Sequence, residues 1–537
     1  MTNLLYKASI VTTPTAYGVG VLNSIKPAQA FGEELVTNGN FATDSDWTKE
    51  GAWTISGGVA SVISSTNDRL YQSISLEADK KYLLSINVVS ISAASVRFRF
   101  GSNGSAANLP EITTPGIHTF TSKPLGGTSS VGIFAVSGTT ATIDSVSVVE
   151  VTDADFDFTR TSSATRVNPD YLIETVATDI PRLDYTNGTA SILLEPASTN
   201  LINYSQAISN TPVKNGTFVD NAAISPDGTL NATKLTATTT DPFFYQNITF
   251  AAATYTSSIY VKGIGDSIGK EFRIAISSST TAPKLIVPSE WTRFEFTATV
   301  GAGTASTGIE ITDPAIVGDE VLVWGWQVEQ QSYATSYIPT SGQSGGVTRA
   351  AETLNNAGNS DLINSTEGVL YAEISSLVGA DNYRQITLTD GSTSDYVLIG
   401  FRNDTGNIYY QVVVNSVVQA SFISTQSSIN TFSKIAVKWK VNDFAIWVNG
   451  IELSSNTSGD SFVANTLNVL NFNIIGVNNF YGRCKTVAVF SEALSDTELA
   501  CLTSTNNREI FLNYYYRMQY VGANTEALSC AEQTFNI

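Results

Sequence analysis

The chain has 537 residues, and its 48 acidic side chains outnumber 29 lysines and arginines, which gives a formal net charge of −19. A chain this acidic lacks the basic face with which proteins displace counterions from phosphate, so its charge argues against nucleic-acid binding and electrostatic attachment to membranes. The one histidine, His118, excludes histidine-rich metal sites and catalytic sites that need several histidines.

The composition is typical of β-proteins, with 39 glycines, 25 phenylalanines and 22 tyrosines against two methionines. The length suggests three or four domains. No apolar run approaches the roughly 20 residues that span a bilayer. Pro14 and Lys26 interrupt the segment that a secretory signal would need to be continuously apolar. We therefore expect that the protein is made in the cytoplasm and does not insert into a membrane.

Residues 1–33 show little hydrophobic periodicity and contain Pro14 and Pro27, which predicts an extended N-terminal arm without a core of its own. Residues 34–151 contain short apolar alternations separated by turn signals. In the last of these runs, Val146 and Val148 alternate with serines. Since period-two alternation buries one face of an antiparallel sheet, residues 34–151 are predicted to form a β-sandwich.

A connector at 152–195 leads to residues 196–335, which are predicted to form a second sandwich that repeats the first. Three sequence markers recur in the same order at similar spacing. Residues 70–76 match 244–250, Pro115 followed by residues 118–120 matches Pro288 followed by residues 291–294, and residues 143–148 match 323–328. Ordered recurrence of this kind predicts a duplicated module.

Residues 336–360 form a Gly/Ser-containing linker, residues 361–510 a third β-domain, and residues 511–537 a tail. Within the third domain, Asn449-Gly450 between two alternating runs predicts a type I′ hairpin. Ser495 followed by Glu498 predicts the capping box of a helix. Trp439 and Trp447 lie inside alternating strands and are predicted to be core residues.

The three cysteines are Cys484, Cys501 and Cys530. Their number is odd and their spacing does not fit a zinc site, so we expect free thiols.

Several stretches in the middle of the chain resemble a linker found in bacteriophage tail and fibre proteins. They are residues 158–168 (FTRTSSATRVN), 181–185 (PRLDY), 193–201 (LLEPASTNL), 326–329 (WQVE), 334–340 (ATSYIPT) and 347–352 (VTRAAE). The resemblance implies a virion-surface protein, made in the cytoplasm of the host bacterium. It also implies a homotrimer that contacts other virion proteins, and we assign that contact to residues 1–33.

The flanking domains resemble broader fold families. Residues 34–151, which open with VTNGNF at 36–41, resemble a galactose-binding-like jelly roll. Residues 361–510, which contain AIWVNG at 445–450, resemble a concanavalin A-like (laminin G-type) sandwich. Together these resemblances imply an all-β chain of tandem antiparallel sandwiches that binds host-surface glycans. Because related jelly rolls often hold structural calcium between their first and last strands, the resemblance also places a candidate calcium ligand at Asp144.

Sugar rings pack their apolar faces on flat aromatic rings, and the candidate glycan-binding residues are Trp47, Trp53, Tyr71 and Tyr245. Trp47 and Trp53 lie in a polar, turn-rich stretch, so at least one of them is predicted to be exposed. No two acids have a spacing that marks them as a glycoside-cleaving pair. We therefore expect a non-catalytic phage appendage, a tail or head fibre, with no cofactor besides that possible calcium. The alternatives are a capsid decoration protein that uses lectin-like folds for protein contacts, and a polysaccharide depolymerase.

Overall fold

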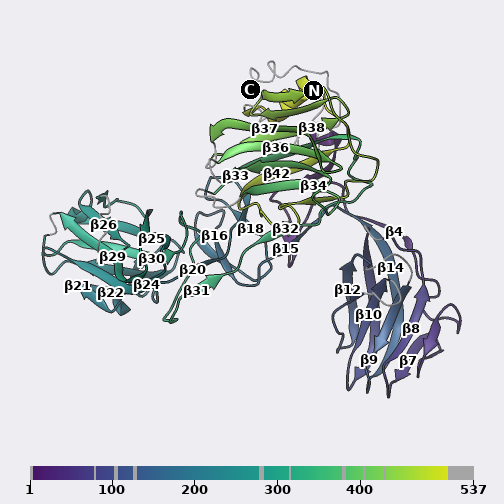
Figure 1. The fold of residues 1–537 in the computed structure, drawn as a ribbon. Helices are drawn as coiled ribbons and strands as arrows, with labels where there is room; N and C mark the ends of the chain where they lie inside the picture. The colour runs from purple at the N-terminus through teal and green to yellow at the C-terminus, as the bar shows by residue number, and fades with distance from the viewer. Residues whose placement is uncertain are drawn as a thin grey trace, which may run out of the picture. The chain divides into compact units, whose positions relative to one another are not determined.

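The protein is all-β in the computed structural model (Figure 1). The structure describes residues 4–77, 80–101, 107–124, 130–276, 284–313, 316–377, 383–402, 406–427 and 431–505. In this part of the chain the one α-helix is α1 (Asp496–Thr503), and no helix has the length and apolar character needed to cross a membrane. The chain divides into two compact units: Ile25–Ala154 with Gly358–Leu362, and the remainder.

The first unit is a two-sheet jelly roll. One sheet has the order β11-β10-β13-β8-β5 and the other β12-β9-β14-β7-β6, with β4 added to β14. The strands are β4 (Ala30–Glu34), β5 (Thr48–Glu50), β6 (Thr54–Ser56), β7 (Val59–Ile63), β8 (Asp68–Ser73), β9 (Lys81–Ser92), β10 (Val96–Gly101), β11 (Ala107–Asn108), β12 (Gly116–Ser122), β13 (Ser130–Ala135) and β14 (Thr140–Thr152). Their inward residues form one hydrophobic cluster, because successive side chains of a strand point to opposite faces.

The second jelly roll, in the other unit, repeats this topology strand for strand. Its sheets have the orders β27-β26-β29-β24-β21 and β28-β25-β30-β23-β22. The strands are β21 (Val213–Asn215), β22 (Thr217–Ile224), β23 (Leu230–Thr236), β24 (Phe243–Phe250), β25 (Ala253–Ile264), β26 (Glu271–Ala275), β27 (Leu285–Ile286), β28 (Thr292–Val300), β29 (Gly303–Asp313) and β30 (Glu320–Glu329). All three repeat markers fall on equivalent strands, namely β8 and β24, β12 and β28, β14 and β30. The predicted duplication is confirmed.

The third sandwich packs an eight-stranded sheet against a five-stranded one. The larger has the order β18-β19-β42-β33-β38-β39-β40, with β1 also on β42, and the smaller has the order β37-β36-β35-β34-β41. The strands are β1 (Ala8–Thr12), β18 (Arg182–Asp184), β19 (Ser191–Leu194), β33 (Glu367–Ser376), β34 (Arg384–Thr389), β35 (Tyr396–Phe401), β36 (Asn407–Val414), β37 (Val417–Ser427), β38 (Ser433–Lys440), β39 (Phe444–Val448), β40 (Ile451–Asn456), β41 (Val469–Asn471) and β42 (Gly482–Phe490). Part of the predicted connector, β18 and β19, thus belongs to this sheet.

Further short strands lie in the unit that holds the second and third sandwiches. They are β2 (Tyr17–Gly18), β3 (Val21–Leu22), β15 (Phe156–Thr159), β16 (Ala164–Val167), β17 (Ile173–Val176), β20 (Ser198–Asn200), β31 (Val347–Arg349) and β32 (Thr353–Asn355). They pair as β2-β3-β15-β32, β16-β17 and β20-β31.

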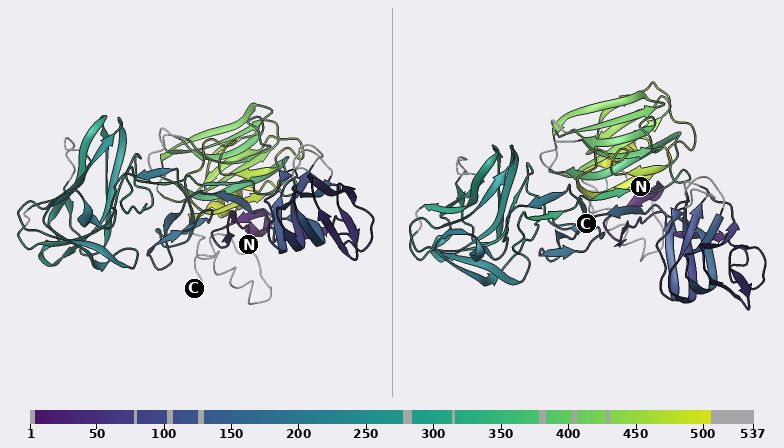
Figure 2. Two further views of the ribbon diagram at one scale, coloured as in Figure 1. Left: turned by 90° about the horizontal axis from the view of Figure 1, so that it is seen from below. Right: turned by 60° about the horizontal axis from the view of Figure 1, so that its bottom comes forward.

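The N-terminal segment is extended, as predicted, but it does not lack a core. Strand β1 pairs antiparallel with β42, with Val11 opposite Ala488, and Ala8 and Val11 are buried in the core of the third sandwich. Figure 2 shows this purple segment beside the yellow-green end of the chain. A free arm at residues 1–33 was therefore a wrong prediction, because an edge of the large sheet is available to pair with it.

Local predictions in the third sandwich are confirmed. Ser495 is the N-cap of α1 and forms the capping box with Glu498. Asn449 and Gly450 both have positive φ, as a type I′ turn requires. Trp439 and Trp447 are buried.

The cysteine prediction is wrong in part. Cys484 is a free, buried thiol, and burial raises its pKa. Cys501 is disulfide-bonded. Cys530 lies outside the described residues. Disulfide geometry depends on folded distances, which an odd count and irregular spacing do not reveal.

Four of the motifs singled out in the sequence, at residues 158–168, 181–185, 193–201 and 347–352, meet in a buried ionic network. Glu352 accepts hydrogen bonds from Arg160 Nη1 and Arg182 Nε, both at 2.8 Å. Glu195 pairs with Arg182 at 2.9 Å and also with Arg349. All five side chains are buried. Burial opposes the charge of Glu195, but Arg349 and Arg182 outweigh it and hold the carboxyl pKa well below its ordinary value. The network thus joins segments that precede the second jelly roll in the sequence to segments that follow it.

Candidate functional site

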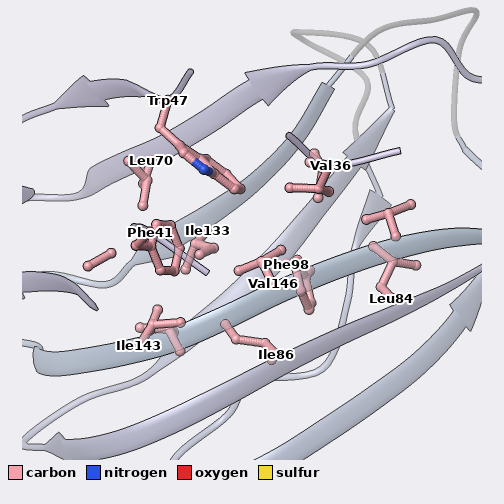
Figure 3. Close-up of a cluster of buried hydrophobic side chains, with 14 of the residues drawn as sticks. Val36, Phe41, Trp47, Leu70, Leu84, Ile86, Phe98, Ile133, Ile143 and Val146 are labelled. Atoms are coloured by element: carbon pink, nitrogen blue, oxygen red, sulfur yellow. The ribbon is translucent and has the colours of Figure 1, made fainter. Parts of the chain in front are cut away.

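The two tryptophans proposed as sugar platforms are core residues. Trp47 and Trp53 are 6% and 4% exposed, and Figure 3 shows Trp47 beside Phe41 and Leu70 in the first core. The Trp47 indole N–H donates to the Asn38 carbonyl at 3.0 Å, and its ring lies 5.4 Å from that of Phe41. Because both rings are part of the hydrophobic core of the first jelly roll, the prediction that one of these tryptophans is exposed is wrong.

Asp144 is exposed, and its carboxylate accepts a hydrogen bond from Asn87 Nδ2 at 3.0 Å. The Asn38 side chain, at the opening of the jelly roll, is used within its own loop, where it bonds Thr43 and Ser45. The described residues contain no group of three or more acidic, histidine or cysteine side chains placed to hold a metal ion. The predicted calcium ligand Asp144 therefore has no supporting cluster in this part of the chain.

Tyr71 and Tyr245 occupy equivalent positions on the outer faces of the two jelly rolls. Tyr71 lies on β8 between the buried Leu70 and Gln72, and Tyr245 lies on β24 between Phe244 and Gln246, which are also buried. Both tyrosines are half-buried. Since neighbouring residues of a strand point to opposite faces, both rings lie on the side of the sheet away from the core.

Each tyrosine faces a glycine on the next strand. Tyr71 is opposite Gly132 of β13, and Tyr245 is opposite Gly308 of β29. A Cβ atom at Gly132 would lie 3.2 Å from Tyr71 Cβ, and one at Gly308 would lie 2.6 Å from Tyr245 Cβ. A larger residue would thus crowd the tyrosine and fill the space beside its ring. In both copies, the same register therefore places a tyrosine ring next to a glycine, where no side chain covers the sheet.

In the first module, arginines lie near Gly132 on the outer face of the sheet. Cross-strand register places two rows on its outer face: Glu50, Arg69, Phe134 and Arg97 in one row, and Thr48, Tyr71, Gly132 and Arg99 in the next. The Arg97 and Arg99 guanidinium carbons lie 5.1 and 5.8 Å from the centre of the Phe134 ring. This face therefore offers aromatic surface and guanidinium donors side by side.

The second module has different neighbours around the same pair. Its rows are Asn215, Phe243, Glu310 and Arg273, and then Val213, Tyr245, Gly308 and Ala275. Phe243 and Tyr245 are stacked, with ring centroids 5.6 Å apart and planes at 21°. Phe243, Glu310 and Ala275 thus occupy the positions that Arg69, Phe134 and Arg99 have in the first module.

The repeated motif also has a structural part. Gln72 Nε2 donates to the Thr37 carbonyl at 2.8 Å, and Gln246 Nε2 donates to the Leu201 carbonyl at 3.1 Å. Each buried glutamine thus holds the non-strand segment that leads into its jelly roll. In the Tyr-Gln dipeptide of each repeat, the glutamine stabilises the fold and the tyrosine is left on the outer face.

The sequence singled out Tyr71 and Tyr245 as candidates, but not Arg97, Arg99 and Phe134, which lie on the same face as Tyr71. The first two belong to the alternating run Val96-Arg97-Phe98-Arg99-Phe100, in which the arginines share one face. That pattern could have indicated a cationic sheet face. Only strand register, however, reveals that Tyr71 and Arg99 flank the same glycine.

No protein-family model and no curated protein matches the chain. Among solved structures, it is similar to a CBM40 module of the Ruminococcus gnavus IT-sialidase bound to α2,6-sialyllactose, at 12% identity over 26% of this chain and 84% of that one, with a TM-score of 0.23. It is also similar to the CBM22-1–CBM22-2 tandem domain of Xyn10C from Paenibacillus barcinonensis, at 12% identity over 57% of this chain and 99% of that one, with a TM-score of 0.22.

A third similar structure is the pair of tandem CBM51 modules of Sp3GH98 from Streptococcus pneumoniae SP3-BS71. The identity is 9% over 59% of this chain and 97% of that one, and the TM-score is 0.19. These neighbours are carbohydrate-binding modules, but at such TM-scores and identities the likenesses do not establish what this chain binds.

Proposed function

We propose that this chain is a non-catalytic bacteriophage appendage, a tail or head fibre on the virion surface, that binds host-surface glycans on the outer faces of its two jelly rolls. The observation that carries glycan binding is the tyrosine opposite a glycine, placed at the same register in both modules. The apolar face of a pyranose packs on such a ring, and the glycine leaves room for the sugar beside it.

The virion assignment rests on the phage-like motifs. Their charged residues come from segments as far apart as Arg160 and Glu352, and they form one buried network. This convergence supports the interpretation of the motif set as a structural unit shared with tail and fibre proteins. In this proposal the network holds the ends of the second jelly roll together while the outer faces stay available to glycans. The same resemblance to tail and fibre proteins implies that the appendage is a homotrimer.

The test measures binding of the purified full chain to a glycan array prepared from host-surface polysaccharides. The double variant Tyr71→Ala/Tyr245→Ala should weaken binding about tenfold or more, since stacking on a flat ring is worth about 1–3 kcal/mol. Tyr171→Ala is the matched control, because Tyr171 is 63% exposed and lies outside both sheet faces. Equal binding by the double variant and the control would refute the assignment of these faces.

A second candidate function is capsid decoration, in which the sandwiches contact other virion proteins. The burial of Trp47 and Trp53 favours it, because it removes two of the four rings that the sequence offered to glycans. Immunogold labelling of intact particles distinguishes a fibre, with label at the tail or on projections, from decoration, with label distributed over the shell.

A further inference from the structure

The outer face of the first jelly roll concentrates positive charge in a strongly acidic chain. Arg69 lies on β8, and Arg97 and Arg99 lie on β10, the strands on either side of β13 in this face, whereas the whole chain carries a net charge of −19. Arg97 and Arg99 both approach the Phe134 ring, at 5.1 and 5.8 Å. Two like charges are thus held around one ring, an arrangement that an anion would stabilise.

The carboxylates nearby leave part of this charge uncompensated. Arg69 pairs with Glu50 at 2.6 Å. Arg97 makes a longer contact of 3.6 Å with Glu111, whose side chain is 54% exposed. Arg99 has no carboxylate partner among the residues that the structure describes. The Nε atoms of Arg97 and Arg99 are buried and have no hydrogen-bond partner there, and burying such donors unpaired is costly.

We infer that the first face binds an anionic sugar, a pyranose that carries a carboxylate or sulfate group. This inference rests on the proposed glycan-binding function and names its ligand class. Tyr71 and Arg99 are both in register with Gly132, so they stand two strand spacings apart, about 10 Å. That span admits one sugar ring over the glycine. The ring packs against Tyr71, and its acidic group accepts hydrogen bonds from Arg99 and Arg97.

The second face lacks this chemistry. At the positions of Arg69, Phe134 and Arg99, it has Phe243, Glu310 and Ala275. Arg273, at the position of Arg97, is directly opposite Glu310. An acid group placed there would meet a carboxylate and find one arginine instead of three. The duplicated modules therefore divide their ligands, with the anionic sugar on the first and a neutral sugar on the second.

The test is affinity electrophoresis of the full chain in gels that contain matched polymers. Polygalacturonate is compared with its neutral methyl ester, and dextran sulfate with dextran, so that carboxylate and sulfate are scored separately. At least one charged polymer should retard the chain more than its neutral partner. Arg99→Gln and Tyr71→Ala should each weaken that retardation about 10- to 100-fold in dissociation constant, while Tyr171→Ala, at an exposed tyrosine outside both faces, should leave it unchanged.

Arg293→Gln is the matched control, because Arg293 also lies over an aromatic ring, 5.7 Å from the centre of Tyr260, but on another sheet. Equal losses in Arg99→Gln and Arg293→Gln would show non-specific attraction and overturn the inference. Retardation by neutral polymers alone, sensitive to Tyr71→Ala, would overturn the anionic class and leave the proposed function standing. No retardation by any polymer, together with a blank glycan array, would overturn both.

Discussion

Replacement of Glu352 by glutamine should destabilise the unit that holds the ionic network. The carboxylate accepts four hydrogen bonds, three from Arg160 and Arg182 and one from the backbone N–H of Glu195. A glutamine keeps one acceptor oxygen and turns an N–H₂ group toward donors, so about half of these bonds are lost. Arg160 and Arg182 are then left with less compensating charge at a site of zero exposure.

Each lost charge-assisted bond costs about 1.5–3 kcal/mol, and breaking a buried ion pair from one side costs about 3–5 kcal/mol. We therefore expect Glu352→Gln to lower the free energy of unfolding by about 3–5 kcal/mol. For a cooperative unit of a few hundred residues, this corresponds to a fall in Tm of about 6 °C or more.

Differential scanning calorimetry of the full chain measures this change, and the transition of the unit formed by residues 25–154 provides an internal reference. Glu290→Gln is the matched control, since Glu290 pairs with Lys262 at 3.0 Å on the surface and is 82% exposed. That variant should cost under about 1 kcal/mol. If both variants melt alike, the network does not carry a buried, mutually compensated charge and the reasoning is refuted.

Three further outcomes are expected. Trp47→Ala should lower the unfolding free energy of the unit formed by residues 25–154 by about 3–5 kcal/mol, because it leaves a cavity in the core, and an unchanged calorimetric transition would contradict that burial. Deletion of residues 1–12 should lower the Tm of the third sandwich by exposing the edge of its sheet; wild-type melting would show that β1 is dispensable. The lowered pKa of Glu195 means that its stabilisation is complete above its ordinary pKa of 4.5 and is lost as the pH falls toward its folded value. Tm should therefore fall with acidification below about pH 4.5, and less steeply in Glu195→Gln; equal slopes would refute the linkage.

The candidate site was predictable only in part. Tyr71 and Tyr245 stood out because they recur in a repeat, and their outward position follows from alternation with buried neighbours. The exposure of Trp47 or Trp53 was predicted wrongly, because a polar, turn-rich surrounding sequence does not show that both rings pack into the core of the first jelly roll. Residue types over a few positions describe local conformation, whereas burial depends on what the rest of the chain places opposite.

By itself, the sequence determined the all-β class, the duplicated jelly roll, the Asn449-Gly450 hairpin and the cap at Ser495. Each of these follows from interactions between residues a few positions apart or from self-similarity of the chain. Tertiary structure alone decided that β1 completes the sheet beside β42 and that Gly132 lies between Tyr71 and Arg99. It also decided that Arg160, Arg182, Glu195, Arg349 and Glu352 meet in one network. These features depend on strand register and on contacts between distant segments, which no local pattern specifies.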